Sequence, residues 1–320
     1  MGFSIGTTRF LLRCHQSGVR FGSTLTLGRQ HMLASPERIE AMMREFKAWP
    51  PPEGEEAFRR ELRQTSWRFD LLLKAIGAKE VVSCDASQYE GASLVHDLNE
   101  PVPTEWENRH DAVIDGGTLE HVFNFPVAIA NCMRLVKPGG HLLIFTPANN
   151  MCGHGFYQFS PELFYRVLSP ENGFEVEEMA MFADATGFSR LLGLVEYPFP
   201  IATPTYAVKD PARIGKRVPL LNDKPSLVCV CAKKIESKKI FATTPQQSDY
   251  VPMWEEDHSQ PTTPEPARGA GIIKWLQARL PESVCREWLP RLAFFVDPFR
   301  AEKNRRANSF ANREFYRRLD

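Results

Sequence analysis

Apolar and polar positions follow two spacings along the chain, and each spacing predicts one kind of element. Short apolar runs that predict strands lie at 23–28, 80–87, 92–99, 111–117, 141–149, 174–182 and 226–234. Apolar residues three or four positions apart predict helices between them, most clearly over 125–136. Buried strands that alternate with helices are typical of a mainly parallel sheet covered on both faces. The pattern therefore predicts an α/β, Rossmann-like fold.

Helices are also predicted over 7–17, 67–78 and 160–170, and on both sides of the prolines at 50–52, where Ser35 would cap a helix that opens on Pro36. Residues 33–66 and 183–225 read as insertions in a domain that spans 1–239. The polar, proline-rich stretch 240–268 predicts a linker or extended arm. Residues 269–320 predict a helical C-terminal extension, which we expect to make any homo-oligomer contact.

Composition narrows the class of protein. The 320 residues include 39 basic and 39 acidic side chains, so the formal net charge is zero, unlike that of a dedicated nucleic-acid binder. No apolar run approaches the roughly 18–20 residues of a membrane span, and the apolar part of RFLLR, residues 9–13, is too short for a secretory signal. Seven cysteines without a CxxC pair favour reduced thiols. We therefore expect a cytoplasmic protein without a membrane span.

Candidate ligand-binding residues follow the predicted strands. The first strand ends at Gly28, where a sharp turn is expected, although such turns usually carry two or three glycines. Asp85, Asp97 and Asp115 follow three later strands. The carboxyl ends of parallel strands form the edge at which open α/β sheets bind ligands. The sequence therefore predicts a binding site at this edge, with a carboxylate available to accept ribose hydroxyls.

Residues 111–149 resemble the fourth and fifth motifs of class I methyltransferases, which use S-adenosylmethionine. The matching pieces are the strand that ends in Asp115, LEHV at 119–122, a helix that ends in RLVKPGG, and the strand after it. The resemblance covers about residues 20–235, without the insertion at 33–66. It implies a seven-stranded sheet whose last strand, 226–234, runs antiparallel.

The resemblance also implies roles for single residues. Asp85 would accept the ribose hydroxyls, and Asp97 would accept the adenine amino group beside the Leu98 backbone. The methionine and sulfonium end would be lined by Gly116, Gly117 and His121.

The first motif departs from the family, because only Gly28 is left of its glycines and Asp85 lies 57 positions later rather than about 20. We hypothesise that Arg29 replaces glycine backbone contacts by holding the methionine carboxylate in two parallel hydrogen bonds. Gln30 would then serve the ammonium group or a ribose oxygen. The alternative is that Arg29 pairs with an acidic neighbour and stiffens the turn.

A sulfonium methyl group is already activated, so the protein must align an acceptor and remove its proton. The candidates for that proton are His154 and Tyr157, in the segment that leaves the fifth strand. This loop favours O-methylation of a small molecule or sugar. Basic residues in the 183–225 insertion, which could cover an anionic acceptor, are Arg190, Lys209, Arg213, Lys216 and Arg217.

Two other classes of function stay open. The missing glycines also fit a protein that binds the cofactor without transferring a methyl group. A nicotinamide-dependent reductase has a similar sheet, but RLVKPGG and the absence of GxGxxG are unlike it. The other histidines show no ligand spacing, so the sequence predicts no metal site.

Overall fold

A computed structural model describes residues 2–65, 68–183, 204–215, 217, 220–250, 279 and 305–320. Its helices are α1 (Ile5–Gln16), α2 (Pro36–Glu45), α3 (Pro52–Thr65), α4 (Phe69–Ala75), α5 (Phe125–Leu135), α6 (Pro161–Val167) and α8 (Pro211–Ile214). Short 3₁₀ turns are η1 (Tyr89–Gly91), η2 (Thr104–Trp106), η3 (Leu119–His121) and η4 (Pro170–Asn172). Arg190 and Lys216 lie outside the described residues.

The strands form a nine-stranded sheet and a two-stranded one. The large sheet has the order β11-β9-β8-β10-β7-β6-β2-β4-β5, and β1 pairs with β3. The strands are β1 (Gly2–Phe3), β2 (Ser23–Leu27), β3 (His31–Met32), β4 (Glu80–Asp85), β5 (Leu94–Val95), β6 (His110–Asp115), β7 (Val136–Asn149), β8 (Phe174–Ala183), β9 (Thr205–Val208), β10 (Ser226–Lys234) and β11 (Tyr316–Arg318).

Seven of these strands are those that the sequence predicts. β5, β4, β2, β6 and β7 are parallel neighbours, whereas β10 lies antiparallel between β7 and β8. The expected antiparallel last strand is therefore confirmed. Because the five parallel strands end at one edge, the residues that follow them gather there.

The two remaining strands of the large sheet, β9 and β11, correct the sequence analysis. β9 lies in the 183–225 insertion, where no strand was predicted, and β11 lies in the extension that was expected to be helical. Residues 251–278 and 280–304, which hold most of the expected linker and extension, lie outside the described residues. β9 pairs antiparallel with both β8 and β11. Both strands are short, and neither has a local apolar pattern. Their backbone hydrogen bonds are made with strands elsewhere in the sequence, so the local sequence does not predict them. The expected linker is also anchored at its start, where Phe241 N donates to Asn172 Oδ1 over 2.8 Å.

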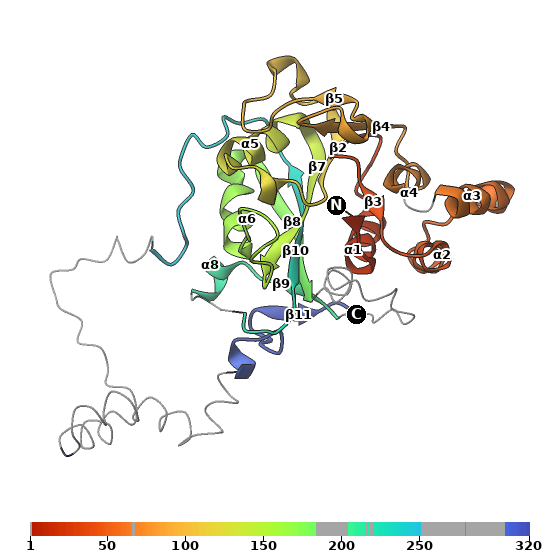
Figure 1. Ribbon diagram of the computed structural model, residues 1–320. Coiled ribbons are helices and arrows are strands. Elements are labelled where there is room, and N and C mark those ends of the chain that lie inside the picture. Colours follow the sequence, from red (N-terminus) through yellow and green to blue (C-terminus); the bar gives the residue numbers. More distant parts are fainter. Residues whose placement is uncertain are drawn as a thin grey trace.

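Helices cover both faces of the sheet, as predicted. Figure 1 shows α1, α2 and α4 on one side of the sheet and α5 and α6 on the other. Alternate strand residues divide between the two cores, so that Val113 faces α5 and Ile114 faces α1. Among the residues that the structure describes, no helix is both long and apolar enough to cross a membrane.

The 33–66 insertion forms α2 and α3 beside α1. Ser35 caps α2 as expected, because its side chain accepts a hydrogen bond from the backbone of Arg38. Ile39, Met42 and Met43 bury one face of α2, so the insertion belongs to the core on that side of the sheet.

Candidate functional site

Two glycine turns stand at the carboxyl edge of the sheet. Gly28 follows β2 with φ of 66°, and Gly117 follows β6 with φ of 100°. Other L residues rarely adopt such angles, so both positions favour glycine. The backbone N–H of Gly28 also donates to Cys84 O over 2.7 Å, which joins the turn to β4.

The Gly28 turn lies close to Asp85, the residue expected to bind the ribose hydroxyls. A Cβ atom placed on Gly28 would lie 3.5 Å from Asp85 Oδ2, 3.7 Å from Gln30 Nε2 and 3.8 Å from Thr118 Oγ1. Asp85 ends β4 and is partly exposed. The turn and this carboxylate therefore face one small space, as the sequence analysis expects.

Gln30 fills the position beside the second glycine turn. Its side chain is buried, and Nε2 donates to Leu27 O over 2.6 Å. Its Oε1 has no hydrogen-bond partner. A Cβ atom on Gly116 would stand 2.6 Å from that oxygen, so a larger residue at 116 would displace the Gln30 side chain. The side-chain amide of Gln30 thus fills the space beside Gly116, and its Oε1 remains available as a hydrogen-bond acceptor.

Arg29 is exposed and lies on the other side of the turn. Its Nη1 stands 3.6 Å from a Cβ atom placed on Gly91, at the end of η1. Within the described part of the chain, no ion pair is formed by this guanidinium, so the acidic neighbour of the alternative hypothesis is not found there. Gly91 follows the strand of Asp85, whereas the methionine end is expected near Gly116. A contact with the methionine carboxylate therefore requires the Arg29 side chain to turn.

Asp97 is placed differently from the other two aspartates. β5 ends at Val95, two residues before it. The exposed carboxylate accepts hydrogen bonds from the backbone and side-chain nitrogens of Asn99, which lower its pKa. Leu98 is buried, and its carbonyl accepts from Asn131 Nδ2 over 3.2 Å. The backbone around Leu98 is therefore fixed, and Asp97 closes its own turn.

Asp115 is fully buried at the end of β6. Its Oδ1 accepts from the backbone N–H groups of Thr118, over 2.7 Å, and Leu119, over 3.3 Å. Burial, followed by the charge of Glu120, raises the pKa of Asp115 to about 8. Its Oδ2 has no hydrogen-bond partner. One oxygen therefore shapes the Gly116–Gly117 turn, and the other is available inside it.

Glu120, His121 and His154 form one cluster. Glu120 Oε1 lies 3.6 Å from His154 Nε2 and 4.0 Å from His121 Nε2. Glu120 is fully buried, His154 is partly exposed and His121 is exposed. Partial burial lowers the pKa of His121. The sequence analysis named both histidines but not Glu120, although it lies in LEHV, because nothing local indicates that a residue 34 positions away meets it.

The loop that carries His154 is bound tightly to η3. The backbone N–H groups of Phe156 and Tyr157 both donate to Glu120 O, over 2.9 Å and 3.2 Å. A Cβ atom on Gly155 would stand 2.8 Å from the same oxygen. Glycine at 155 therefore permits the close approach that brings His154 to Glu120.

Tyr157 lies in the same loop but is directed elsewhere. Its hydroxyl donates to Phe123 O over 2.6 Å, and its ring packs beside Phe125 and Phe159. Of the two residues proposed to take a proton, only His154 has an unpartnered polar atom in this structure.

A pocket of about 450 Å³ opens beyond the end of β7. Its walls include Asn149, Phe159, Met181 and Tyr316, which come from the sheet, the start of α6 and the C-terminal strand. Arg217 also lines it, and its Nε donates to Asp249 Oδ2 over 2.5 Å. The charge of this arginine is thus already balanced at the pocket wall.

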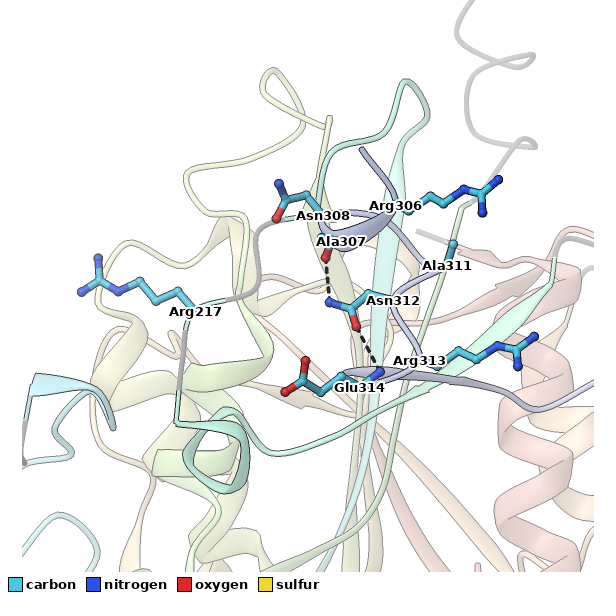
Figure 2. Close-up of a pocket in the computed structure, with 8 residues that line it drawn as sticks. All are labelled: Arg217, Arg306, Ala307, Asn308, Ala311, Asn312, Arg313 and Glu314. Atoms are coloured by element: carbon cyan, nitrogen blue, oxygen red, sulfur yellow. Dashed lines mark hydrogen bonds between the residues drawn. The ribbon is translucent and has the colours of Figure 1, made fainter. Parts of the chain in front are cut away.

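A second pocket lies between Arg217 and residues 306–314. In Figure 2, Asn312 Nδ2 donates to Ala307 O and Asn312 Oδ1 accepts from Glu314 N. The side chain of Arg217 points away from those of Arg306 and Arg313, so the three guanidinium groups do not meet at one point.

The strand order defines the type of fold. The sheet has the seven-stranded core with an antiparallel last strand that the resemblance implied, and the chain has the class I methyltransferase fold. No protein-family model matches the sequence, and no curated protein matches it.

Solved structures show weak overall likeness. A S-adenosylmethionine-dependent methyltransferase from Mesorhizobium loti is 14% identical, with a TM-score of 0.33 over 70% of this chain and 95% of that one. A SAM-dependent methyltransferase from Thermotoga maritima is 14% identical, with a TM-score of 0.34 over 72% and 90%. The branched-chain polyamine synthase from Thermus thermophilus is 14% identical, with a TM-score of 0.34 over 76% and 61%. At these values we rest the fold assignment on the strand order.

Proposed function

We propose that the chain is an S-adenosylmethionine-dependent methyltransferase that acts on a hydroxyl group of a small molecule or sugar. The observation that carries this proposal is the partly exposed Asp85 carboxylate beside the Gly28 turn, at the carboxyl edge of this fold. A carboxylate there suits the two hydroxyls of a ribose. The unpartnered Oε1 of Gln30 is an acceptor suited to the ammonium group of the cofactor.

The proposed transfer is an in-line displacement. The acceptor oxygen attacks the methyl carbon, the carbon–sulfur bond breaks, and its electron pair stays on sulfur as the positive charge is lost. The hydroxyl proton passes to a base, for which His154 Nε2 is the candidate. The pocket beyond β7 is the candidate acceptor site, because its largely uncharged walls suit a small molecule. Tyr157 would help to shape this region rather than accept the proton.

A second candidate is a protein that binds the cofactor without transferring its methyl group. The bonded hydroxyl of Tyr157 favours it, because one of the two expected proton acceptors is already engaged. Binding of S-adenosylmethionine without transfer to any hydroxyl acceptor would support this candidate. Both candidates require the cofactor site, so binding is tested first.

Calorimetry with S-adenosylhomocysteine tests that site. We expect Asp85→Ala to weaken binding by about 2–4 kcal/mol, because two hydrogen bonds to a charged acceptor are lost. Asp223→Ala is the matched control, since this aspartate is exposed in the turn before β10. Equal affinities for wild type and Asp85→Ala would contradict the assignment.

A further inference from the structure

Three side chains at the end of β6 direct metal-ligating atoms toward one point. Glu120, His121 and His154 each offer one such atom, and the three atoms all lie within 4.8 Å of one another. Two of them, Glu120 Oε1 and His154 Nε2, are buried and have no hydrogen-bond partner. Their separation of 3.6 Å is longer than a normal N–H···O bond. Hydrogen bonds within the cluster therefore leave both of these atoms unsatisfied.

The same place buries a carboxylate without a matching cation. Glu120 is fully buried. It forms no ion pair with a lysine or arginine among the residues that the structure describes. A buried carboxylate that lacks a partner costs several kcal/mol. A bound cation would remove this cost, whereas a hydrogen bond to a neutral histidine would remove only part of it.

The scaffold holds the three ligands in place before any ion binds. Thr146 Oγ1 donates to Glu120 Oε2 over 3.1 Å, which leaves Oε1 directed at the histidines. The backbone bonds of residues 156 and 157 to Glu120 O fix the loop of His154. Gly155 lets this loop approach His121 closely. Ligand orientation by such neighbours is typical of metal sites.

We propose that Glu120, His121 and His154 bind one divalent transition-metal ion, with Zn²⁺ as the best match. One carboxylate and two imidazoles suit zinc, and three protein ligands leave a position open for water or another oxygen. Zinc–ligand bonds of about 2.1 Å place ligand atoms about 3.4 Å apart in a tetrahedral site. The two separations from Glu120 Oε1 are 3.6 Å and 4.0 Å, and all three ligand atoms lie within 4.8 Å of one another, so side-chain rotations must bring them closer by up to about 1.4 Å.

This inference does not rest on the proposed methyl transfer, but it changes the role of His154. An ion bound at His154 Nε2 occupies the atom that would otherwise accept the proton. Binding of S-adenosylhomocysteine in the presence of a chelator tests the cofactor site separately, so the two proposals can fail independently.

The experiment is a Zn²⁺ titration of the full chain after chelation and dialysis, followed by calorimetry. We expect one equivalent to bind, and Glu120→Gln, His121→Ala and His154→Ala each to lower the affinity at least about tenfold. Thr146→Val keeps every ligand and loses only the bond to Glu120 Oε2, so we expect a loss of about 10- to 100-fold. Co²⁺ should bind in the wild type with a visible spectrum that Glu120→Gln abolishes.

Two control variants separate this site from other zinc binding. His31 also lies beside a glutamate, with Nε2 3.7 Å from Glu90 Oε1, so His31→Ala should bind Zn²⁺ like the wild type. Cys152 is exposed in the same loop, and Cys152→Ser should behave likewise. Circular dichroism confirms that each variant is folded. No stoichiometric binding, or equal affinity in wild type, Glu120→Gln and Thr146→Val, would overturn the proposal.

Discussion

Gln30 and Gly116 share a space that holds only one side chain. The amide of Gln30 is buried there, and a Cβ atom on Gly116 would stand 2.6 Å from its Cδ and 2.9 Å from Phe3 Cε2. Phe3 is itself fixed, because its ring stacks on Phe69 with centroids 3.9 Å apart. The turn after β6 is therefore supported by a side chain from the turn after β2.

Gly116→Ala should disturb both turns at once. We expect it to lower stability by about 1–3 kcal/mol through overpacking and to weaken S-adenosylhomocysteine binding. Thermal unfolding and calorimetry measure the two effects. Gly54→Ala is the control, because a Cβ atom there meets nothing within 4 Å, and alanine is compatible with the first turn of α3. Unchanged stability and binding in Gly116→Ala would contradict the close contact between Gly116 and the Gln30 side chain.

Arg29→Lys tests the hypothesis that Arg29 holds the methionine carboxylate of the cofactor. Lysine keeps the charge but loses the planar fork, so S-adenosylmethionine binding should weaken by about 1–3 kcal/mol. Adenosine has no carboxylate and should bind both proteins alike. A purely stabilising arginine would instead lower the melting temperature and change both affinities similarly. The comparison needs two ligands and two folded proteins.

At the scale of elements, α2 and α3 are joined by an ion network. Arg59 donates to both carboxylate oxygens of Glu40, over 3.1 Å and 2.9 Å, and also to Glu55 over 2.5 Å. Arg44 contacts the same two glutamates and lies over the ring of Trp49. These bonds hold the two helices of the insertion against each other.

The network makes a pH-dependent contribution to stability. Hydrogen bonds, first from Arg59, lower the pKa of Glu40 from 4.5 to about 2. A lowered pKa in the folded state means that the stabilisation is complete above the unfolded value and is lost as the pH falls toward the folded one. Glu40→Gln should therefore cost about 0.5–1 kcal/mol at pH 7, and the difference should narrow as the pH falls from about 4.5 toward about 2. Urea unfolding at several pH values measures it, and a gap that widened in acid would contradict the assignment.

Local patterns predicted some elements well and others not at all. β7 and α5 have long apolar patterns, and both were found where the spacing placed them. β9 pairs with β8 and β11, and β11 pairs with β9, and no local spacing in the sequence indicates these pairings. For the same reason, the contact between Glu120 and His154 could not be predicted from the local sequence. At the cofactor edge, the positions of Gly28 and Asp85 could be predicted, but the burial of Gln30 against Gly116 could not.

At the scale of the whole molecule, the two ends of the chain meet on one domain. Arg13 Nη2 donates to Leu319 O across 306 positions, and the backbone N–H of Thr205 donates to Asp320 Oδ1 across 115 positions. Figure 1 shows β11, in blue, at the edge of the sheet beside β9. Phe315 and Tyr316 are buried there and form part of the wall of the pocket beyond β7.

Tyr316→Ala should loosen this edge. Removal of a buried aromatic ring costs about 3–5 kcal/mol, and the ring of Tyr316 contacts Phe310 and Phe315. Tyr316→Phe keeps the ring and should be close to wild type. Chemical unfolding gives the difference, and amide hydrogen exchange in β9 should rise in the alanine variant alone. Equal protection in both variants would contradict a role for β11 in holding β9.

The late position of β11 also matters while the chain is being made. β9 is complete long before its outer partner exists, since Thr205 and Asp320 are 115 positions apart. At about 5–20 residues per second, the ribosome needs roughly 6–23 s to synthesise those 115 residues. During this interval the outer side of β9 is an unpaired strand edge, which is a template for aggregation. A nascent chain that stops before residue 316 keeps that edge, so synthesis of β11 is what protects the outer side of β9.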